Sequence, residues 1–192
     1  MGIPPHAFVL TMNLLLLSVG PSAVELGKAS GSGTIDRIRP NPATPDQPTT
    51  EKVPFTARTS WAYHVAIGGQ TYTWLVLADQ EPPAATDRDA ANVDEARRNW
   101  CARAKASFVA VMLTREGEVN LTELCAGDGE VNTEMLSRAN GLDSTVVTLT
   151  SHDRRHLAGA LRMGRGSCPG PGDQAEYCEK TGDFVFDAPF VP

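Results

Sequence analysis

The sequence predicts a mainly β fold, in which antiparallel hairpins form a β-sandwich or an open barrel, with one α-helix. Apolar and polar residues alternate along several segments, whereas helical spacing is clear in one segment. The 192 residues include 17 glycines and 14 prolines, which is typical of turn-rich β proteins. We therefore expect a signal peptide over residues 1–22, an irregular lead-in over 23–52 and a single β-rich domain over 53–192.

The first two dozen residues predict export. The apolar run from Ala7 to Leu17 is shorter than the roughly 20 residues that span a bilayer. Small residues follow it at Gly20, Ser22 and Ala23, where a signal peptidase could cleave. No lysine or arginine precedes the run, so a buried strand or a mis-assigned start codon is the alternative. We expect a secreted or periplasmic mature chain without a membrane span.

The lead-in is rich in Gly, Ser, Pro and Thr, and it predicts one short strand over residues 34–38. Residues 53–67 alternate between apolar and polar, which predicts one strand with one buried face. Gly68 and Gly69 predict a two-residue turn after it, because both central positions of the favoured turn have positive φ. This turn makes Tyr63 face Trp74 across the hairpin.

The predicted hairpin places four aromatic side chains on one face, namely Trp61, Tyr63, Tyr72 and Trp74. Such a face could stack on a sugar or line an apolar ligand cavity. It could equally be hydrophobic core, in which aromatic pairs across strands are ordinary stabilisers. We favour core, because aromatic residues make up 6% of the chain and a core needs some of them. His64 lies on the other face, toward Thr73.

The one helix is predicted over residues 87–104, after a Pro-Pro pair, with Thr86 as its cap. Arg97 and Arg98 can each pair with Asp94, which predicts a solvated outer face. The predicted buried stripe contains Val93, Ala96, Trp100 and Ala104.

The rest of the chain predicts strands. Residues 107–113 are apolar on both faces, as in a central strand, and a turn at Gly117 leads to a strand over residues 119–125. Residues 145–151 and 156–163 predict a third hairpin. In the last strand, Pro189 indicates an end at or near a sheet edge. The predicted buried face of that strand contains Phe184, Phe186, Ala188 and Phe190.

Four cysteines follow the predicted signal peptide, namely Cys101, Cys125, Cys168 and Cys178. An even number in an oxidising compartment predicts disulfides, with three possible pairings. We favour Cys168 with Cys178, around a Pro-Gly loop, and by default Cys101 with Cys125. Zinc is the alternative, since His152 and His156 precede the last two cysteines, but the spacing lacks a C-x2-C pair.

Three stretches resemble a loosely defined group of uncharacterised secreted and periplasmic β-rich proteins of proteobacteria. They are Ser60-Trp61-Ala62-Tyr63, residues 75–82, and Leu157-Ala158-Gly159 followed by the closing Phe184-Val185-Phe186-Asp187-Ala188-Pro189. The resemblance spans most of residues 53–191. It implies export and a β-rich fold, and it implies no catalytic motif.

Charge and motifs exclude several function classes. The 17 Lys and Arg against 23 Asp and Glu give a net charge of −6, which argues against a nucleic-acid partner. The sequence has no nucleophile elbow, P-loop, HExxH helix or dinucleotide fingerprint, so no catalytic residue, metal or cofactor is predicted. The weak metal candidates are His152 and His156, for which two exposed turn histidines are the simpler interpretation.

These observations predict an exported non-enzymatic protein, either a binding module or an envelope-associated structural protein. Its partner would be a small molecule, a sugar or an envelope protein. The alternative is a metal-dependent or hydrolytic enzyme that uses His152, His156 and Asp153.

Overall fold

The structure is a computed structural model of the chain. It describes residues 26–39, 41–44, 49–81, 93–127, 131–135, 145–164, 166–169, 175–178 and 181–191. For some of these it describes the backbone alone: residues 36–39, 50, 93–96, 98, 131–135, 166–169 and 175–178. The predicted signal peptide over residues 1–22 lies outside the described residues.

Most of the described chain is antiparallel strand, which confirms the predicted fold class. In chain order the elements are β1 (Gly27–Arg39), β2 (Thr49–Thr56), β3 (Thr59–Ile67), β4 (Gln70–Ala78), α1 (Val93–Ala104), β5 (Ser107–Leu113), β6 (Val119–Ala126), β7 (Val131–Met135), β8 (Val146–His152), β9 (His156–Met163), β10 (Gly166–Pro169), β11 (Ala175–Cys178) and β12 (Thr181–Pro189). Ten strands form one sheet in the order β7-β6-β5-β4-β3-β1-β12-β9-β8, with β2 paired to β1, and β10 pairs with β11 separately.

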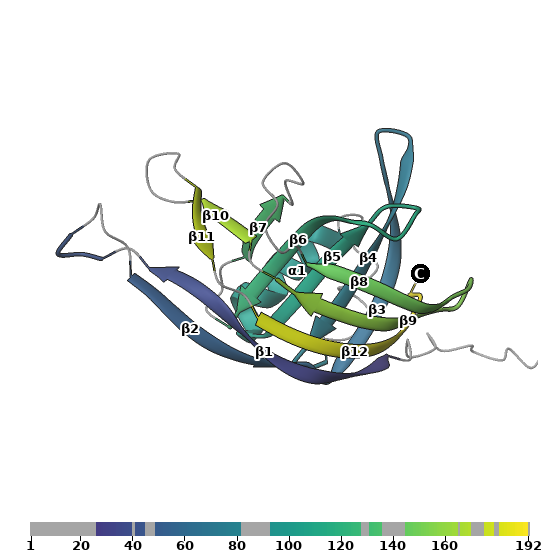
Figure 1. Ribbon diagram of the computed structural model, residues 1–192, viewed down its shortest axis with the longest axis horizontal. Helices are drawn as coiled ribbons and strands as arrows, with labels where there is room; N and C mark the ends of the chain where they lie inside the picture. The colour runs from purple at the N-terminus through teal and green to yellow at the C-terminus, as the bar shows by residue number, and fades with distance from the viewer. Residues whose placement is uncertain are drawn as a thin grey trace, which may run out of the picture.

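The large sheet curls into an open half-barrel, so it has a concave and a convex face (Figure 1). Each face has its own core. The concave core joins side chains from distant strands, among them Phe55, Leu75, Val111, Leu161 and Phe184. The convex core lies between β3–β6 and α1 and includes Trp61, Tyr63, Trp74, Trp100 and Phe108.

Several hairpins match the predictions. Gly68 and Gly69 have φ of 59° and 81°, and Tyr63 faces Trp74 as the two-residue turn requires. Every residue of β5 is buried, because α1 covers one face of this strand and the concave core covers the other. The third hairpin, β8 with β9, is also confirmed.

The prediction of an irregular lead-in is wrong for β1, a 13-residue strand that pairs with β12, β2 and β3. Its glycines resemble loop residues in the sequence, but they serve close backbone approach. A Cβ at Gly27, Gly31 or Gly33 would overlap a backbone carbonyl of β12. Small residues therefore allow β1 to lie in the middle of the sheet.

The single strand predicted over residues 53–67 is in fact two strands, β2 and β3, which separate at Ala57 and Arg58. The amide of Ala57 donates to the carbonyl of Gly31 on β1, whereas the amide of Arg58 donates to Ala78 on β4. From this point the chain pairs with β4 on one side, while the first residues of β3 still pair with the start of β1 on the other. Consequently Phe55 belongs to the concave core, while Trp61 and Tyr63 belong to the convex core.

Two further predictions need correction. β12 lies between β1 and β9, not at a sheet edge. Its pairing with β1 ends at Asp187, so Pro189, which has no amide hydrogen to donate, comes after the residues that pair with β1. In α1, Trp100 is buried as predicted, but Ala104 is exposed in the last turn. The predicted cap Thr86 lies outside the described residues. Within the described chain, no helix combines the length and the apolar character that a membrane crossing needs.

Candidate functional site

The aromatic face predicted from the first hairpin is mostly covered. Trp61, Tyr63 and Trp74 are 5%, 3% and 1% exposed, and they lie beneath α1. The ring of Trp61 packs against that of Trp100 at 5.8 Å between centroids. Tyr72 is half-buried nearer the hairpin tip, where its hydroxyl donates to Oε1 of a glutamine two residues before it. Tyr72 also lines a hollow.

The prediction that Arg97 lies on a solvated helix face is wrong. Its side chain is 3% exposed, and its guanidinium donates twice to the Glu123 carboxylate on β6, at 3.2 and 2.7 Å. The guanidinium carbon also lies 4.2 Å from the Trp74 ring centre and 5.6 Å from that of Tyr63. Three strands therefore surround one helical arginine: β6 supplies the carboxylate, and β4 and β3 supply the two ring faces.

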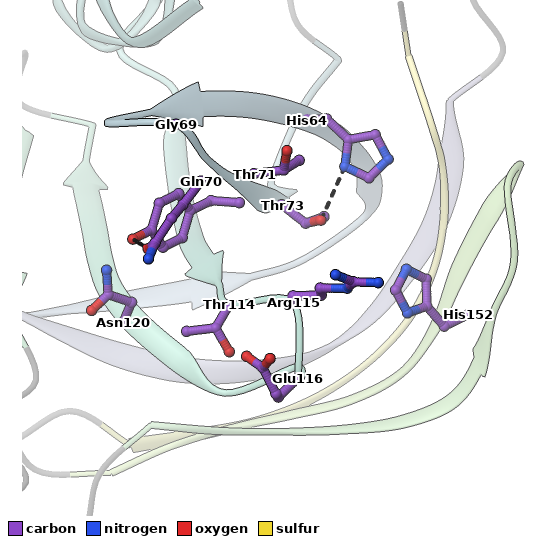
Figure 2. Close-up of a pocket in the computed structure, with 11 residues that line it drawn as sticks. His64, Gly69, Gln70, Thr71, Thr73, Thr114, Arg115, Glu116, Asn120 and His152 are labelled. Atoms are coloured by element: carbon purple, nitrogen blue, oxygen red, sulfur yellow. Dashed lines mark hydrogen bonds between the residues drawn. The ribbon is translucent and has the colours of Figure 1, made fainter.

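A polar hollow of about 610 Å³ lies at one end of the half-barrel (Figure 2). Its lining comes from three segments that are distant in the sequence. They are the β3–β4 hairpin with His64 and residues 69–73, the β5–β6 turn with residues 114–116 and Asn120, and His152 at the end of β8. The polar side chains of this lining can donate or accept hydrogen bonds, and one arginine and one glutamate add charge.

The β5–β6 turn holds Arg115 and Glu116 at the rim of the polar hollow. The amide of Gly117 donates to the carbonyl of Thr114 at 3.0 Å, and Gly117 has a φ of 83° that a residue with a side chain rarely adopts. The hydroxyl of Thr114 accepts from the amide of Glu118, and the two backbones also bond at 2.8 Å. These bonds define the backbone from which both charged side chains extend.

The imidazole of His64 is held from two sides. Its Nδ1 lies 3.1 Å from the Thr73 hydroxyl, as the predicted face of His64 requires, and its ring stacks on Phe190 at 4.5 Å. The Phe190 ring also lies 6.3 Å from that of His152. The amide of Phe190 donates to the carbonyl of Arg155, which links this residue to the β8–β9 hairpin that carries His152. Nδ1 of His64 is thereby occupied, and Nε2 is left for other partners.

The structure does not bring His152 and His156 together. His152 pairs with Leu157 across the hairpin, so it shares a sheet face with Leu157, and adjacent residues of a strand point to opposite faces. His156 is accordingly exposed where Leu157 is buried. Nδ1 of His156 lies 3.0 Å from a carboxylate oxygen of Asp187 on β12.

Asp153 has a structural role in the β8–β9 turn. Its carboxylate accepts hydrogen bonds from the amides of Arg155 and His156, at 2.7 and 2.9 Å. These two bonds lower the pKa of Asp153, because they favour its charged form. Within the described residues, no three His, Cys, Asp or Glu side chains gather as they would around a metal ion.

One of the two favoured disulfides is present: Cys101 on α1 is bonded to Cys125 on β6, with 6.1 Å between their Cα atoms. Both cysteines are fully buried in the convex core. Cys168 and Cys178 lie on the paired strands β10 and β11. Their side chains lie outside what the structure describes, so their pairing stays a prediction.

No motif in the sequence marks the other residues that line the polar hollow with Tyr72 and the two histidines, above all Arg115. The weak signal was position alone, since Arg115 and Gln70 each border a predicted hairpin turn. No local pattern indicates that these turns meet in space.

Comparisons with protein families, with curated proteins and with solved structures found no match. The resemblance to exported proteobacterial proteins and the export itself stay predictions, and the function is inferred from the geometry of the chain.

Proposed function

We propose that the protein is an exported, non-enzymatic binding protein that holds a small polar molecule in the polar hollow. The observation that carries the proposal is the hollow itself. Its volume of about 610 Å³ falls in the range of about 300 to 1,000 Å³ that is typical of small-molecule sites. Its hydrogen-bonding groups converge from separate elements, as in sites that orient a ligand.

Two further observations support this proposal over the enzymatic alternative. Asp153 is engaged with its own turn, and His156 is paired with Asp187 on the opposite face from His152. Asp153, His156 and His152 therefore do not converge on one point, as an active site made of these three residues would require. The disulfide between Cys101 and Cys125 supports export, because disulfides persist in oxidising compartments.

The proposal is tested by titrating the ¹⁵N-labelled protein with a probe panel and following amide chemical shifts. The panel contains glucose, N-acetylglucosamine, glycerol, succinamide, succinate and inorganic phosphate. We expect at least one probe to produce saturable shifts that cluster at residues 69–73 and 114–116, which line the hollow.

A pair of matched variants locates the site. Thr71 is exposed within the hollow, so Thr71→Trp should fill the space and abolish binding. Thr148 is exposed on β8 outside the hollow, so Thr148→Trp should leave binding unchanged. A panel without any saturable binding, or binding that survives Thr71→Trp, would contradict the proposal.

A further inference from the structure

We infer that the polar hollow recognises an oxyanion, a carboxylate or a phosphate carried by the small molecule, and that Arg115 binds this group. The inference rests on the proposed function, because it names the ligand class of the same site. It depends on three nitrogen-bearing side chains that the fold brings to one place from three elements: Arg115, His64 and His152.

Arg115 has the chemistry and the freedom for this role. A guanidinium is always charged at neutral pH, and its planar fork matches the two oxygens of a carboxylate or phosphate. Within the described part of the chain, Arg115 makes no salt bridge. Its backbone is defined by the Thr114–Gly117 hydrogen bond, so the side chain starts from a fixed point at the rim.

The two histidines flank the space that this guanidinium reaches. In Figure 2 the Arg115 side chain extends between the His64–Thr73 pair on one side and His152 on the other. Nδ1 of His64 is occupied by Thr73, which leaves Nε2 as its remaining polar atom. In the tautomer in which the Thr73 hydroxyl donates to Nδ1, Nε2 carries the proton, and an oxygen bound to the fork of Arg115 can accept from it. Phe190 lies against the rings of both histidines.

The net negative charge of the protein opposes anion binding, so binding would have to depend on the local contact with Arg115. The chain has a net charge of −6, so its long-range field repels anions and the attraction must come from direct contact. Glu116 is the one carboxylate of the described lining and lies next to Arg115. Removing its charge should strengthen oxyanion binding, whereas removing the charge of Arg115 should weaken it.

The test uses succinate against succinamide, which share a carbon skeleton and differ in charge, with inorganic phosphate as a second oxyanion. We expect succinate, phosphate or both to bind at the hollow more tightly than succinamide. Arg115→Gln should weaken oxyanion binding about tenfold or more, because a bidentate, charge-assisted contact is lost. Glu116→Gln should tighten it.

Two control variants separate the local contact from general charge. Arg103 is exposed in the last turn of α1, so Arg103→Gln removes the same charge away from the hollow and should leave affinity unchanged. His152→Ala should weaken binding, while His156→Ala, on the opposite face of the same hairpin, should not. Equal unfolding midpoints for the Arg115 and Arg103 variants would show that the fold is intact.

The outcomes distinguish this inference from the proposed function. If glucose or succinamide binds in the hollow and no oxyanion does, the ligand class is wrong and the binding function stands. Oxyanion binding that is unaffected by Arg115→Gln also overturns the inference. If no probe binds, both fail. Comparing succinate with phosphate identifies which oxyanion source the site prefers.

Discussion

At the residue scale, one tertiary contact explains why Arg97 is buried although its helical spacing predicts a solvent-exposed side chain. On its own helix Arg97 follows a nearby aspartate, and a charged side chain normally stays in water because burial of an unpaired charge costs several kcal/mol. The carboxylate of Glu123, 26 residues later in the chain, offsets that cost by pairing with the guanidinium at 2.7 Å. The rings of Trp74 and Tyr63 then interact with the guanidinium through their faces.

We expect Arg97→Ala to lower the free energy of unfolding by about 3 to 5 kcal/mol, because it leaves the Glu123 carboxylate buried without this partner. Urea denaturation measures the change. The matched variant Arg103→Ala, on the exposed side of the same helix, should change stability by less than about 0.5 kcal/mol. In the double variant Arg97→Met with Glu123→Leu, the loss should be smaller than the sum of the single losses. Equal effects of Arg97→Ala and Arg103→Ala would contradict the buried ion pair.

At the element scale, β1 is the strand that unites the sheet. It pairs with β2 on one side along its second half, with β3 at its start and with β12 on the other side. Its glycines allow the backbones of β1 and β12 to approach where a Cβ would collide with a carbonyl. The composition of this segment is therefore explained by contact with a neighbouring strand and not by a loop.

We expect Gly33→Ala to destabilise the protein by about 1 to 3 kcal/mol, because the added methyl group would overlap the carbonyl of Thr181 on β12. Ser32 is the matched control: it is the exposed neighbour of Gly33 on the same strand and already carries a Cβ. Ser32→Ala should change stability by less than about 0.5 kcal/mol. Thermal unfolding of both variants provides the comparison, and a neutral Gly33→Ala would mean that β1 and β12 do not approach so closely.

At the scale of the whole molecule, one sheet supports two cores. The curl lets strands from both ends of the sheet cover the concave face, whereas α1 covers the convex face of β3–β6. The Cys101–Cys125 disulfide links α1 to β6 beneath this helix. All three tryptophans of the chain, Trp61, Trp74 and Trp100, belong to the convex core.

We expect the variant Cys101→Ala with Cys125→Ala to lose about 3 kcal/mol of stability, because the unfolded chain regains the entropy of a loop between residues 24 apart in sequence. The fluorescence of the three tryptophans reports on the unfolding of the convex core. In the native protein iodide should quench their fluorescence weakly, since each is no more than 5% exposed. Quenching in the variant should rise at lower urea concentrations than in the native protein. Coincident unfolding curves would contradict a stabilising link between α1 and β6.

Local features of the fold were predictable from the sequence because their causes are local. Two glycines define the turn of the first hairpin through their positive φ, and the turn length then determines that Tyr63 faces Trp74. An apolar run without alternation indicated a strand buried on both faces, which β5 is. The candidate site was less accessible: Tyr72, His64 and His152 were noted individually, but nothing in the sequence joined them to Arg115.

The sequence by itself determined the β class of the protein and its hairpins, since spacing and turn chemistry act over a few residues. It favoured the pairing of Cys101 with Cys125 only by default among three possible pairings, and the structure shows that bond. Only the tertiary structure decided that β2 and β3 part at Ala57, that Arg97 is buried, and that three distant segments enclose the polar hollow. The curl of the sheet is the physical reason, because it places residues far apart in sequence against one another.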